Sequence, residues 1–349
     1  MEFDAVLIAP RRAASIAKGL WHDKTINTEL DACLAACPDK LALTAVQAEG
    51  GAVKRFTYRE LAAMADRVAV GLYRLGVRKN DIVACQLPNW WQFTITYLAC
   101  SRIGAVMNPL MHIFRERELS FMLKHGEAKV VIVPKVFRGF DFEAMATGLR
   151  ASLPDLQHIV VVGGEGESSF EKLLSGPAWE SEADAASILQ SNRSGPDDVT
   201  QLIYTSGTTG EPKGVMHTAN TVMANIFPYA QRLRLAADDV VLMASPMAHQ
   251  TGFMYGLMMP ILLRQSVVLL DVWEPLKAID LIRDESVSFT MASTPFLTDL
   301  AKNVESSGKT VPTLKIFLCA GAPIPGPLVE QARRVLGTKI VSAWGMTEN

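Results

Sequence analysis

YTSGTTGEPKGV, residues 204–215, packs four hydroxyl side chains, three glycines and one lysine into a single turn-prone loop between two apolar runs, residues 199–204 and 214–217. Glycine lets successive backbone N–H groups converge on an anion. Hydroxyl and ammonium groups donate well to phosphate oxygens. We therefore expect the loop to bind a polyphosphate through Thr205, Ser206, Gly207, Thr208, Thr209, Gly210 and Lys213.

Two other interpretations compete with phosphate binding. Segments rich in Gly, Ser and Thr are most often solvated turns, but the flanking β-like runs and the number of donors favour a ligand site here. A Walker A loop needs Gly-Lys-Ser/Thr, whereas Pro212 precedes Lys213 and Gly214 follows it. A kinase or GTPase of that class thus loses its main support.

Short β-branched runs alternate with helical patterns along the chain. Thr57 and Glu60 form a capping box before a helical apolar pattern that runs to Gly76. Such alternation predicts an α/β protein with two mostly parallel sheets and helices on both faces. The expected strands are residues 82–87, 105–108, 130–133, 159–162, 240–244, 267–270, 288–291, 315–319 and 340–342.

A connector rich in Ser, Gly, Pro and acidic residues, 175–198, divides these runs into two sets. It predicts a first α/β subdomain over residues 1–175, including the N-terminal segment, and a second over 176–349 with the phosphate loop. His249, residues 320–323 and residues 344–348 all follow predicted strands. Ligands of open α/β sheets bind at the carboxyl ends of strands, so one cleft is expected to collect them.

Composition agrees with an enzyme that has a sizeable core: 49% of residues are hydrophobic and 20% are charged. The formal net charge of -2 gives no reason to expect nucleic acid as a partner. Five cysteines without zinc-like pairs fit a reducing compartment. We find no signal-peptide pattern, and the most apolar run, residues 254–263, is too short to span a bilayer. The cytoplasm is the expected location, and association between copies of the chain is left open.

Five segments in one order resemble the motifs of the adenylate-forming superfamily, which includes acyl- and aryl-CoA ligases. Besides the phosphate loop, they are FTYREL (56–61), DIVACQLPN (81–89), PMAHQTG (246–252), AGAP (320–323) and AWGMTE (343–348). The resemblance implies the large N-terminal domain of an acyl-CoA synthetase. It also implies ATP-dependent conversion of a carboxylic acid to an acyl-adenylate with release of pyrophosphate, followed by transfer to coenzyme A.

The same resemblance assigns roles to residues after the strands. Glu348 would hold Mg²⁺, Thr347 would donate to the α-phosphate, and His249 would orient the carboxylate. The adenine would lie between the Trp344 ring and the backbone of Gly321, Ala322 and Pro323. Taken alone, Trp344 would more often be a core residue and His249 a hydrogen-bonded structural one; the full set of motifs favours the ligand site.

Gly345 indicates the size of the acid that the pocket accepts. Acetate-specific relatives carry a second large aromatic there, so a glycine implies a pocket open to larger acyl groups. Apolar residues within 253–263 and 294–297 are candidates to line it. The resemblance is to ligases for medium-chain acids or cyclohexanecarboxylate, and no acidic residue stands out to bind the α-ammonium of an amino acid.

Family members continue beyond the magnesium segment, whereas this sequence stops at Asn349. The resemblance therefore implies an N-terminal fragment without the hinge and the lysine of the smaller mobile domain. We expect weak or undetectable ligase activity from it alone. A peptide-synthetase-type adenylation domain, a luciferase-like oxygenase and a non-catalytic nucleotide-binding fragment remain the alternatives.

Overall fold

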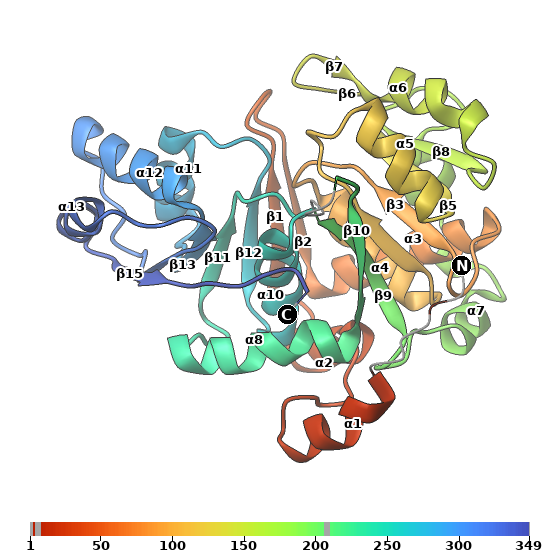
Figure 1. The fold of residues 1–349 in the computed structure, drawn as a ribbon, viewed down its shortest axis with the longest axis horizontal. Helices are drawn as coiled ribbons and strands as arrows, with labels where there is room; N and C mark the ends of the chain where they lie inside the picture. The colour runs from red at the N-terminus through yellow and green to blue at the C-terminus, as the bar shows by residue number, and fades with distance from the viewer. Residues whose placement is uncertain (1–2, 4–7, 206–209, 349) are drawn as a thin grey trace.

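Two large sheets and their covering helices form the molecule in the computed structural model, which describes residues 3, 8–205 and 210–348 (Figure 1). Both sheets are mostly parallel, and each has one antiparallel strand at an edge. The expected α/β class with two mostly parallel sheets is confirmed.

The larger sheet has seven strands within the described residues, in the order β15-β14-β13-β11-β12-β1-β2. Only β2 runs antiparallel to its neighbour. The strands are β1 (Leu41–Val46), β2 (Val53–Thr57), β11 (Val240–Met243), β12 (Ser266–Leu270), β13 (Phe289–Ala292), β14 (Ile316–Cys319) and β15 (Lys339–Ser342).

The second sheet has six strands in the described part of the chain, in the order β10-β9-β4-β3-β5-β8. Its antiparallel edge is the β9-β10 hairpin around the glycine-rich loop. The strands are β3 (Ile82–Cys85), β4 (Val106–Pro109), β5 (Ala128–Pro134), β8 (His158–Val162), β9 (Val199–Thr205) and β10 (Lys213–Thr218), with a separate ribbon of β6 (Val136–Phe137) and β7 (Phe140–Asp141).

Helices fill the space between the sheets and cover their outer faces. The inner layer includes α2 (Ile26–Ala36), α3 (Tyr58–Arg74), α4 (Trp91–Arg102), α7 (Ala185–Ser191), α8 (Ala219–Leu233), the π-helix η4 (Phe253–Met258) and α10 (Met259–Leu263). The larger sheet is covered outside by α11 (Pro275–Asp284), α12 (Thr294–Ser307) and α13 (Gly326–Leu336), and the smaller one by α5 (Glu116–His125) and α6 (Phe142–Leu149). The short elements are α1 (Ile8–Ala17), α9 (Gln250–Gly252), η1 (Arg150–Ser152), η2 (Glu171–Ser175) and η3 (Trp179–Ser181).

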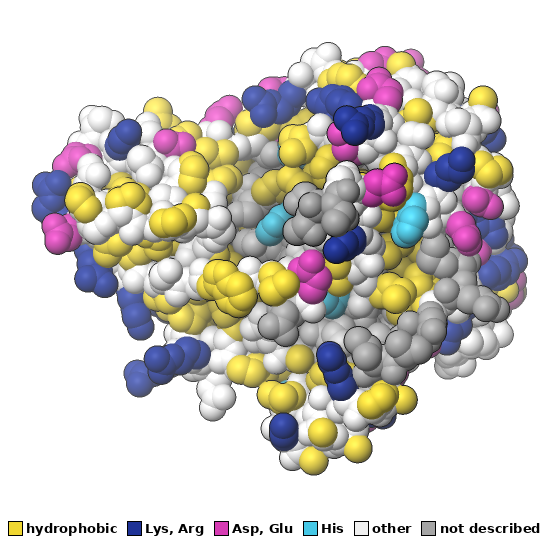
Figure 2. Space-filling model, viewed as in Figure 1, with side chains coloured by type: hydrophobic (Ala, Val, Ile, Leu, Met, Phe, Trp, Pro, Cys, Tyr) yellow, Lys and Arg dark blue, Asp and Glu magenta, His cyan; other side chains and the backbone are white. Residues whose placement is uncertain are grey.

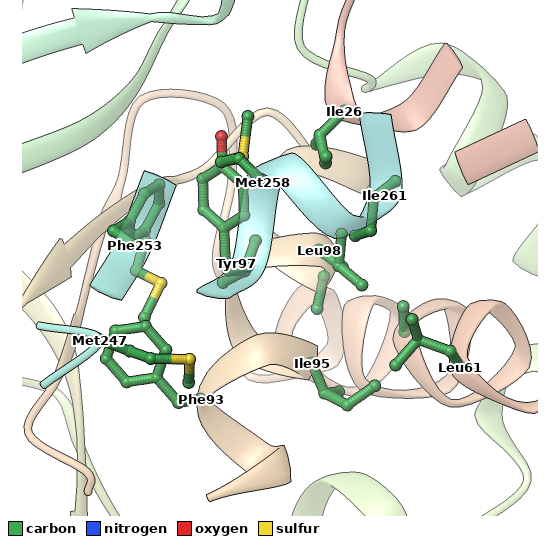
Figure 3. Packing of buried hydrophobic residues seen from close by; sticks show 14 of the residues in the cluster. Ile26, Leu61, Phe93, Ile95, Tyr97, Leu98, Met247, Phe253, Met258 and Ile261 are labelled. Atoms are coloured by element: carbon green, nitrogen blue, oxygen red, sulfur yellow. The ribbon is translucent and has the colours of Figure 1, made fainter. Parts of the chain in front are cut away.

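Strand residues alternate between the inner and outer cores. In β3, Val83 joins the core between the sheets, whereas Ile82 and Ala84 join the outer one. This explains the continuous apolar runs in the sequence, because both faces of a covered parallel sheet are buried. Figure 3 shows the inner core, where Phe253 packs edge-on against Tyr97 with ring centroids 4.7 Å apart. The π-helix that follows His249 is therefore anchored in the centre of the molecule.

The expected strands are confirmed with ends shifted by a few residues, and Thr57 caps α3 in a capping box with Glu60. The strands β1 and β2 were missed. They lie before residue 175 but pair within the larger sheet, while β9 and β10 lie after it and extend the smaller sheet. Each sheet thus takes strands from both sides of the expected division at 175/176. The division into two subdomains stays a prediction, and it does not coincide with the membership of the two sheets.

The surface carries charges of both signs (Figure 2). Lys, Arg, Asp and Glu side chains are interspersed over the face in Figure 2. No helix in the described part of the chain is both long and apolar enough to cross a membrane. The apolar run at 254–263 instead forms η4 and α10 in the inner layer.

Candidate active site

The glycine-rich loop closes the β9-β10 hairpin. Thr205 ends β9 and lies directly opposite Lys213, the first residue of β10. Gly210 has φ +107°, a conformation that favours glycine, as expected for this loop. Ser206, Gly207, Thr208 and Thr209 lie outside the described residues. The hairpin thus places the two ends of the predicted phosphate loop side by side.

A backbone carbonyl and a side chain of α5 hold the stem of this hairpin. The hydroxyl of Tyr204 lies 3.2 Å from the Met122 carbonyl oxygen, to which it donates, and 2.9 Å from Nδ1 of His125. Burial raises the pKa of the Tyr204 hydroxyl. A neutral tyrosine that is held in this way fixes the direction in which the chain enters the loop.

His249 lies just after β11, where it caps the short helix α9. Its Nδ1 accepts a hydrogen bond from the backbone N of Thr251 at 3.2 Å. His249 is partly exposed to solvent, and desolvation by the surrounding protein lowers the pKa of its imidazole, which favours the neutral ring. Because Nδ1 is the acceptor, the proton of the neutral ring is on Nε2. His249 therefore presents a hydrogen-bond donor at the site.

Gly252 lets the chain fold tightly around His249. A Cβ at this position would lie 2.3 Å from the carbonyl oxygen of Pro246 and 2.7 Å from the Cα of Met247. No side chain fits at that distance from backbone atoms. The PMAHQTG segment thus needs its final glycine for close packing, and this packing fixes the position of His249.

One cavity of about 250 Å³ opens beside His249. Five of the predicted site residues line it together: His249, Gly321, Trp344, Gly345 and Thr347. Trp344 is 84% exposed, so its ring is not a core residue and is available for stacking. The other lining residues are Asn225, Tyr229, Gln250, Thr251, Met254, Tyr255, Met291, Ala320, Ala343 and Met346.

Tyr229 and Tyr255 form an aromatic wall of this cavity. Their rings stack with centroids 4.4 Å apart, and the Tyr229 hydroxyl donates to the Met291 sulfur at 3.4 Å. Burial raises the pKa of both hydroxyls, that of Tyr255 to about 12, so both are neutral near pH 7. Met254 and Tyr255 come from the expected lining segment at 253–263. The segment at 294–297 does not line the cavity, because Leu297 is buried in the outer core of the larger sheet.

Several predicted site residues are not part of the cavity wall. Ala322 and Pro323 follow Gly321 in a loop that the Thr294 hydroxyl holds, at 3.4 and 3.1 Å from their carbonyl oxygens. Thr205, Gly210 and Lys213 belong to the hairpin, and Glu348 is an exposed residue after Thr347.

Glu348 was the residue expected to bind Mg²⁺. Within the described residues, no three His, Cys, Asp or Glu side chains form a metal-binding group. A metal held only by protein side chains is therefore not indicated there. Mg²⁺ commonly uses one or two protein carboxylates and completes its shell with phosphate oxygens and water. An exposed carboxylate that follows a cavity residue fits that second pattern.

The sequence analysis did not identify His217 as a site residue. It lies on β10, is only 8% exposed, and its Nε2 lies 2.7 Å from the carbonyl oxygen of Thr347. This hydrogen bond joins the β9-β10 hairpin to the wall of the cavity. A histidine that follows a glycine-rich loop gave no signal by itself, because its partner is 130 residues away in the sequence.

Comparisons with known proteins agree with this geometry. The model of the family described as "AMP-binding enzyme" matches residues 30–349. The medium-chain fatty-acid–CoA ligase of Escherichia coli K12 is 34% identical over 339 residues, which are 97% of this chain and 58% of that enzyme. The chain thus spans less than two thirds of the length of this relative.

Solved structures show the same fold. The apo structure of MbtA from Mycobacterium smegmatis matches with a TM-score of 0.79 and 26% identity, over 100% of this chain and 61% of that one. The ATP-bound RpMatB-BxBclM chimera B1 matches with a TM-score of 0.76 and 25% identity, over 94% and 60% of the two chains. On the family match, which covers most of its length, this chain belongs to the AMP-binding enzyme family.

Proposed function

We propose that these residues form the ATP- and acid-binding part of an acid–thiol ligase. Such an enzyme would convert a carboxylic acid and ATP to an acyl-adenylate and pyrophosphate, and then transfer the acyl group to coenzyme A. The observation that carries the proposal is the cavity in which His249, Gly321, Trp344 and Thr347 meet. The similarity to a medium-chain ligase and to an ATP-bound structure supports it.

The first half-reaction joins two anions. A carboxylate oxygen forms a bond to the α-phosphorus, and the bond from that phosphorus to the bridging oxygen of pyrophosphate breaks. Positioning and fixed donors must offset the repulsion between the reactants. Lys213 and the amides of the glycine-rich loop would hold the departing phosphates, and the Thr347 hydroxyl would donate to the α-phosphate. When bound by Glu348, Mg²⁺ would neutralise charge on the phosphate oxygens.

His249 would orient the acid. A carboxylic acid is already ionised at pH 7, so the reaction needs no general base. The neutral ring with its proton on Nε2 would donate to the carboxylate without adding a full charge. The tight PMAHQTG turn would keep that donor at one place between the acyl and nucleotide sides of the cavity.

The acid would be of medium length or alicyclic. Met254, Met291 and the stacked pair of Tyr229 and Tyr255 offer an apolar and aromatic wall. Gly345 lines the same cavity and adds no side chain to it. A pocket with such walls favours an apolar acyl group over a small or charged one.

Two alternative functions are compatible with the same residues. A peptide-synthetase-type adenylation domain would activate amino acids, and a nucleotide-binding scaffold would bind ATP without turnover. The weak ligase activity of the 349 residues alone and the cytoplasmic location stay predictions.

Acid-dependent exchange of pyrophosphate into ATP separates these functions. With the 349-residue chain at high concentration, we expect slow exchange with octanoate or cyclohexanecarboxylate and none with amino acids. His249→Ala should lower the exchange about tenfold or more, whereas His158→Ala, at the start of β8 in the other sheet, should not. Exchange with amino acids alone would favour the adenylation domain. MgATP binding without exchange for any acid would favour the scaffold.

A further inference from the structure

His217 connects two parts of the site that are far apart in the sequence. It lies four residues after Lys213 on the same strand, and its imidazole is buried. Its Nε2 meets the Thr347 carbonyl oxygen at 2.7 Å. A strand is stiff over this length, so the position of the ring is fixed relative to Lys213. The ring thus links the β9-β10 hairpin to the Thr347 segment, which would contact the α-phosphate.

The hydrogen-bond partners assign the proton on this ring. A carbonyl oxygen can only accept, so Nε2 carries hydrogen and donates to Thr347. The other nitrogen, Nδ1, lies 3.3 Å from the hydroxyl of Thr221, in the capping box at the start of α8. Contacts at both nitrogens fix the plane of the imidazole, and the helix start acts as its support.

The segment that His217 contacts lies after the last strand of the larger sheet. Ala343 still bonds to the neighbouring strand through Cys319, but residues 344–348 have no regular helix or strand structure. Between described residues, the hydrogen bond to His217 is the one that joins Thr347 to another element of the fold. The imidazole therefore ties the Thr347 backbone to β10.

We propose that His217 is a positioning residue for adenylation: it holds the Thr347 backbone so that the Thr347 hydroxyl points at the α-phosphate. The inference rests on the proposed function of the cavity. The role is indirect, because His217 touches Thr347 and not the nucleotide.

Calorimetric titration of the 349-residue chain with AMP and with adenosine tests this role. His217→Leu should weaken AMP binding about tenfold, because the Thr347 carbonyl loses its donor and the hydroxyl is no longer held toward the phosphate, and should change adenosine binding less than about twofold. His217→Gln, which keeps an N–H donor at similar reach, should restore most of the AMP affinity. Gln201 is the matched control, because it is fully buried directly opposite His217 on β9, so Gln201→Leu should leave AMP binding unchanged.

A double-mutant cycle distinguishes positioning from general structural support. Thr347→Val removes the hydroxyl but keeps the carbonyl that His217 contacts. In that background His217→Leu should cost less than about twofold in AMP affinity, because the group that it positions is gone. A further tenfold loss of AMP affinity from His217→Leu in the Thr347→Val background would overturn the proposed role of His217. A loss of adenosine binding equal to that of AMP binding would do the same, and both results would leave the proposed nucleotide site standing. A wild-type chain that binds neither AMP nor adenosine would overturn the proposed nucleotide site as well.

Discussion

The side chain of Asn89 holds the backbone of Met247: its Oδ1 accepts a hydrogen bond from the Met247 N at 2.8 Å. Its Nδ2 donates to the Ser245 carbonyl oxygen at 2.9 Å and lies 3.2 Å from that of Leu270. Asn89 follows β3 of the smaller sheet, whereas its partners follow strands of the larger one. One buried carboxamide thus joins the carboxyl ends of both sheets directly before His249.

Asn89→Ala should lower the free energy of unfolding by about 2–4 kcal/mol, because it leaves a buried N–H and carbonyl oxygens without their partner. Denaturant unfolding of the variant measures the change. Asn303→Ala is the control, since that side chain bonds only one turn back within α12, and should change stability by less than about 1 kcal/mol. Equal losses in the two variants would contradict the bridging role of Asn89.

Gly252→Ala should displace the His249 turn, because its Cβ would meet the Pro246 carbonyl oxygen at 2.3 Å. We expect the free energy of unfolding to fall by about 2 kcal/mol or more. The exchange of pyrophosphate into ATP should also be stimulated less by the carboxylic acid. Gly326→Ala, at the start of α13 with open space around it, should be neutral or slightly stabilising. Thermal unfolding of both variants checks this, and a Gly252→Ala protein as stable as the wild type would refute the close contact.

The sequence predicted most of the fold because parallel strands that are buried on both faces leave continuous apolar runs, as in Val130 and Val131 of β5. The edge strand β2 leaves no such run, since Lys54 and Arg55 are exposed there. Its pairing with β1 is local, but the place of β1 beside β12 depends on contacts more than 200 residues apart. Patterns within a short window do not report such pairings.

Trp344→Ala should weaken nucleotide binding about 5- to 100-fold, the range expected when one base loses its aromatic stacking partner. Because Trp344 is 84% exposed, the stability of the fold should change by less than about 0.5 kcal/mol. Trp344→Phe should retain part of the affinity. Titration with MgATP measures the effect, and unchanged affinity in Trp344→Ala would place the adenine elsewhere.

Acid should destabilise the fold through imidazoles whose pKa is lowered in the folded protein. Desolvation lowers the pKa of His249, and desolvation together with Arg138 and Arg115 lowers that of the half-buried His112. A depressed imidazole pKa means that the unfolded chain binds more protons below its ordinary pKa of about 6.5. The stability that the neutral rings contribute is thus fully present above that pH and falls as the pH drops toward the folded pKa. The fall is at most about 1.4 kcal/mol per pH unit for His112, and less for His249, whose charge solvent screens.

Denaturant unfolding at pH 7.5, 6.5 and 5.5 measures this slope. His112→Gln should make it shallower, because one titrating ring is removed. A variant with the same slope as the wild type would show that His112 does not contribute.

The candidate site was predicted as a set of segments, and the cavity brings five of the named residues together. What the sequence did not show were the groups that hold those residues. Asn89, Gly252 and His217 act through single contacts with backbone atoms of distant segments or of a tight turn. Such contacts follow from the folded geometry, and a residue type alone does not reveal them.

Titration with a non-hydrolysable octanoyl-adenylate, in which a sulfamoyl group replaces the phosphate, tests the central claim most directly. If the cavity forms an acyl-adenylate, the wild-type chain should bind this compound at least about tenfold more tightly than AMP. The reason is that the compound fills both the acyl side and the nucleotide side of the cavity. Trp344→Ala and His249→Ala should each weaken that binding about tenfold. No binding by the wild type, or undiminished binding in both variants, would contradict the account.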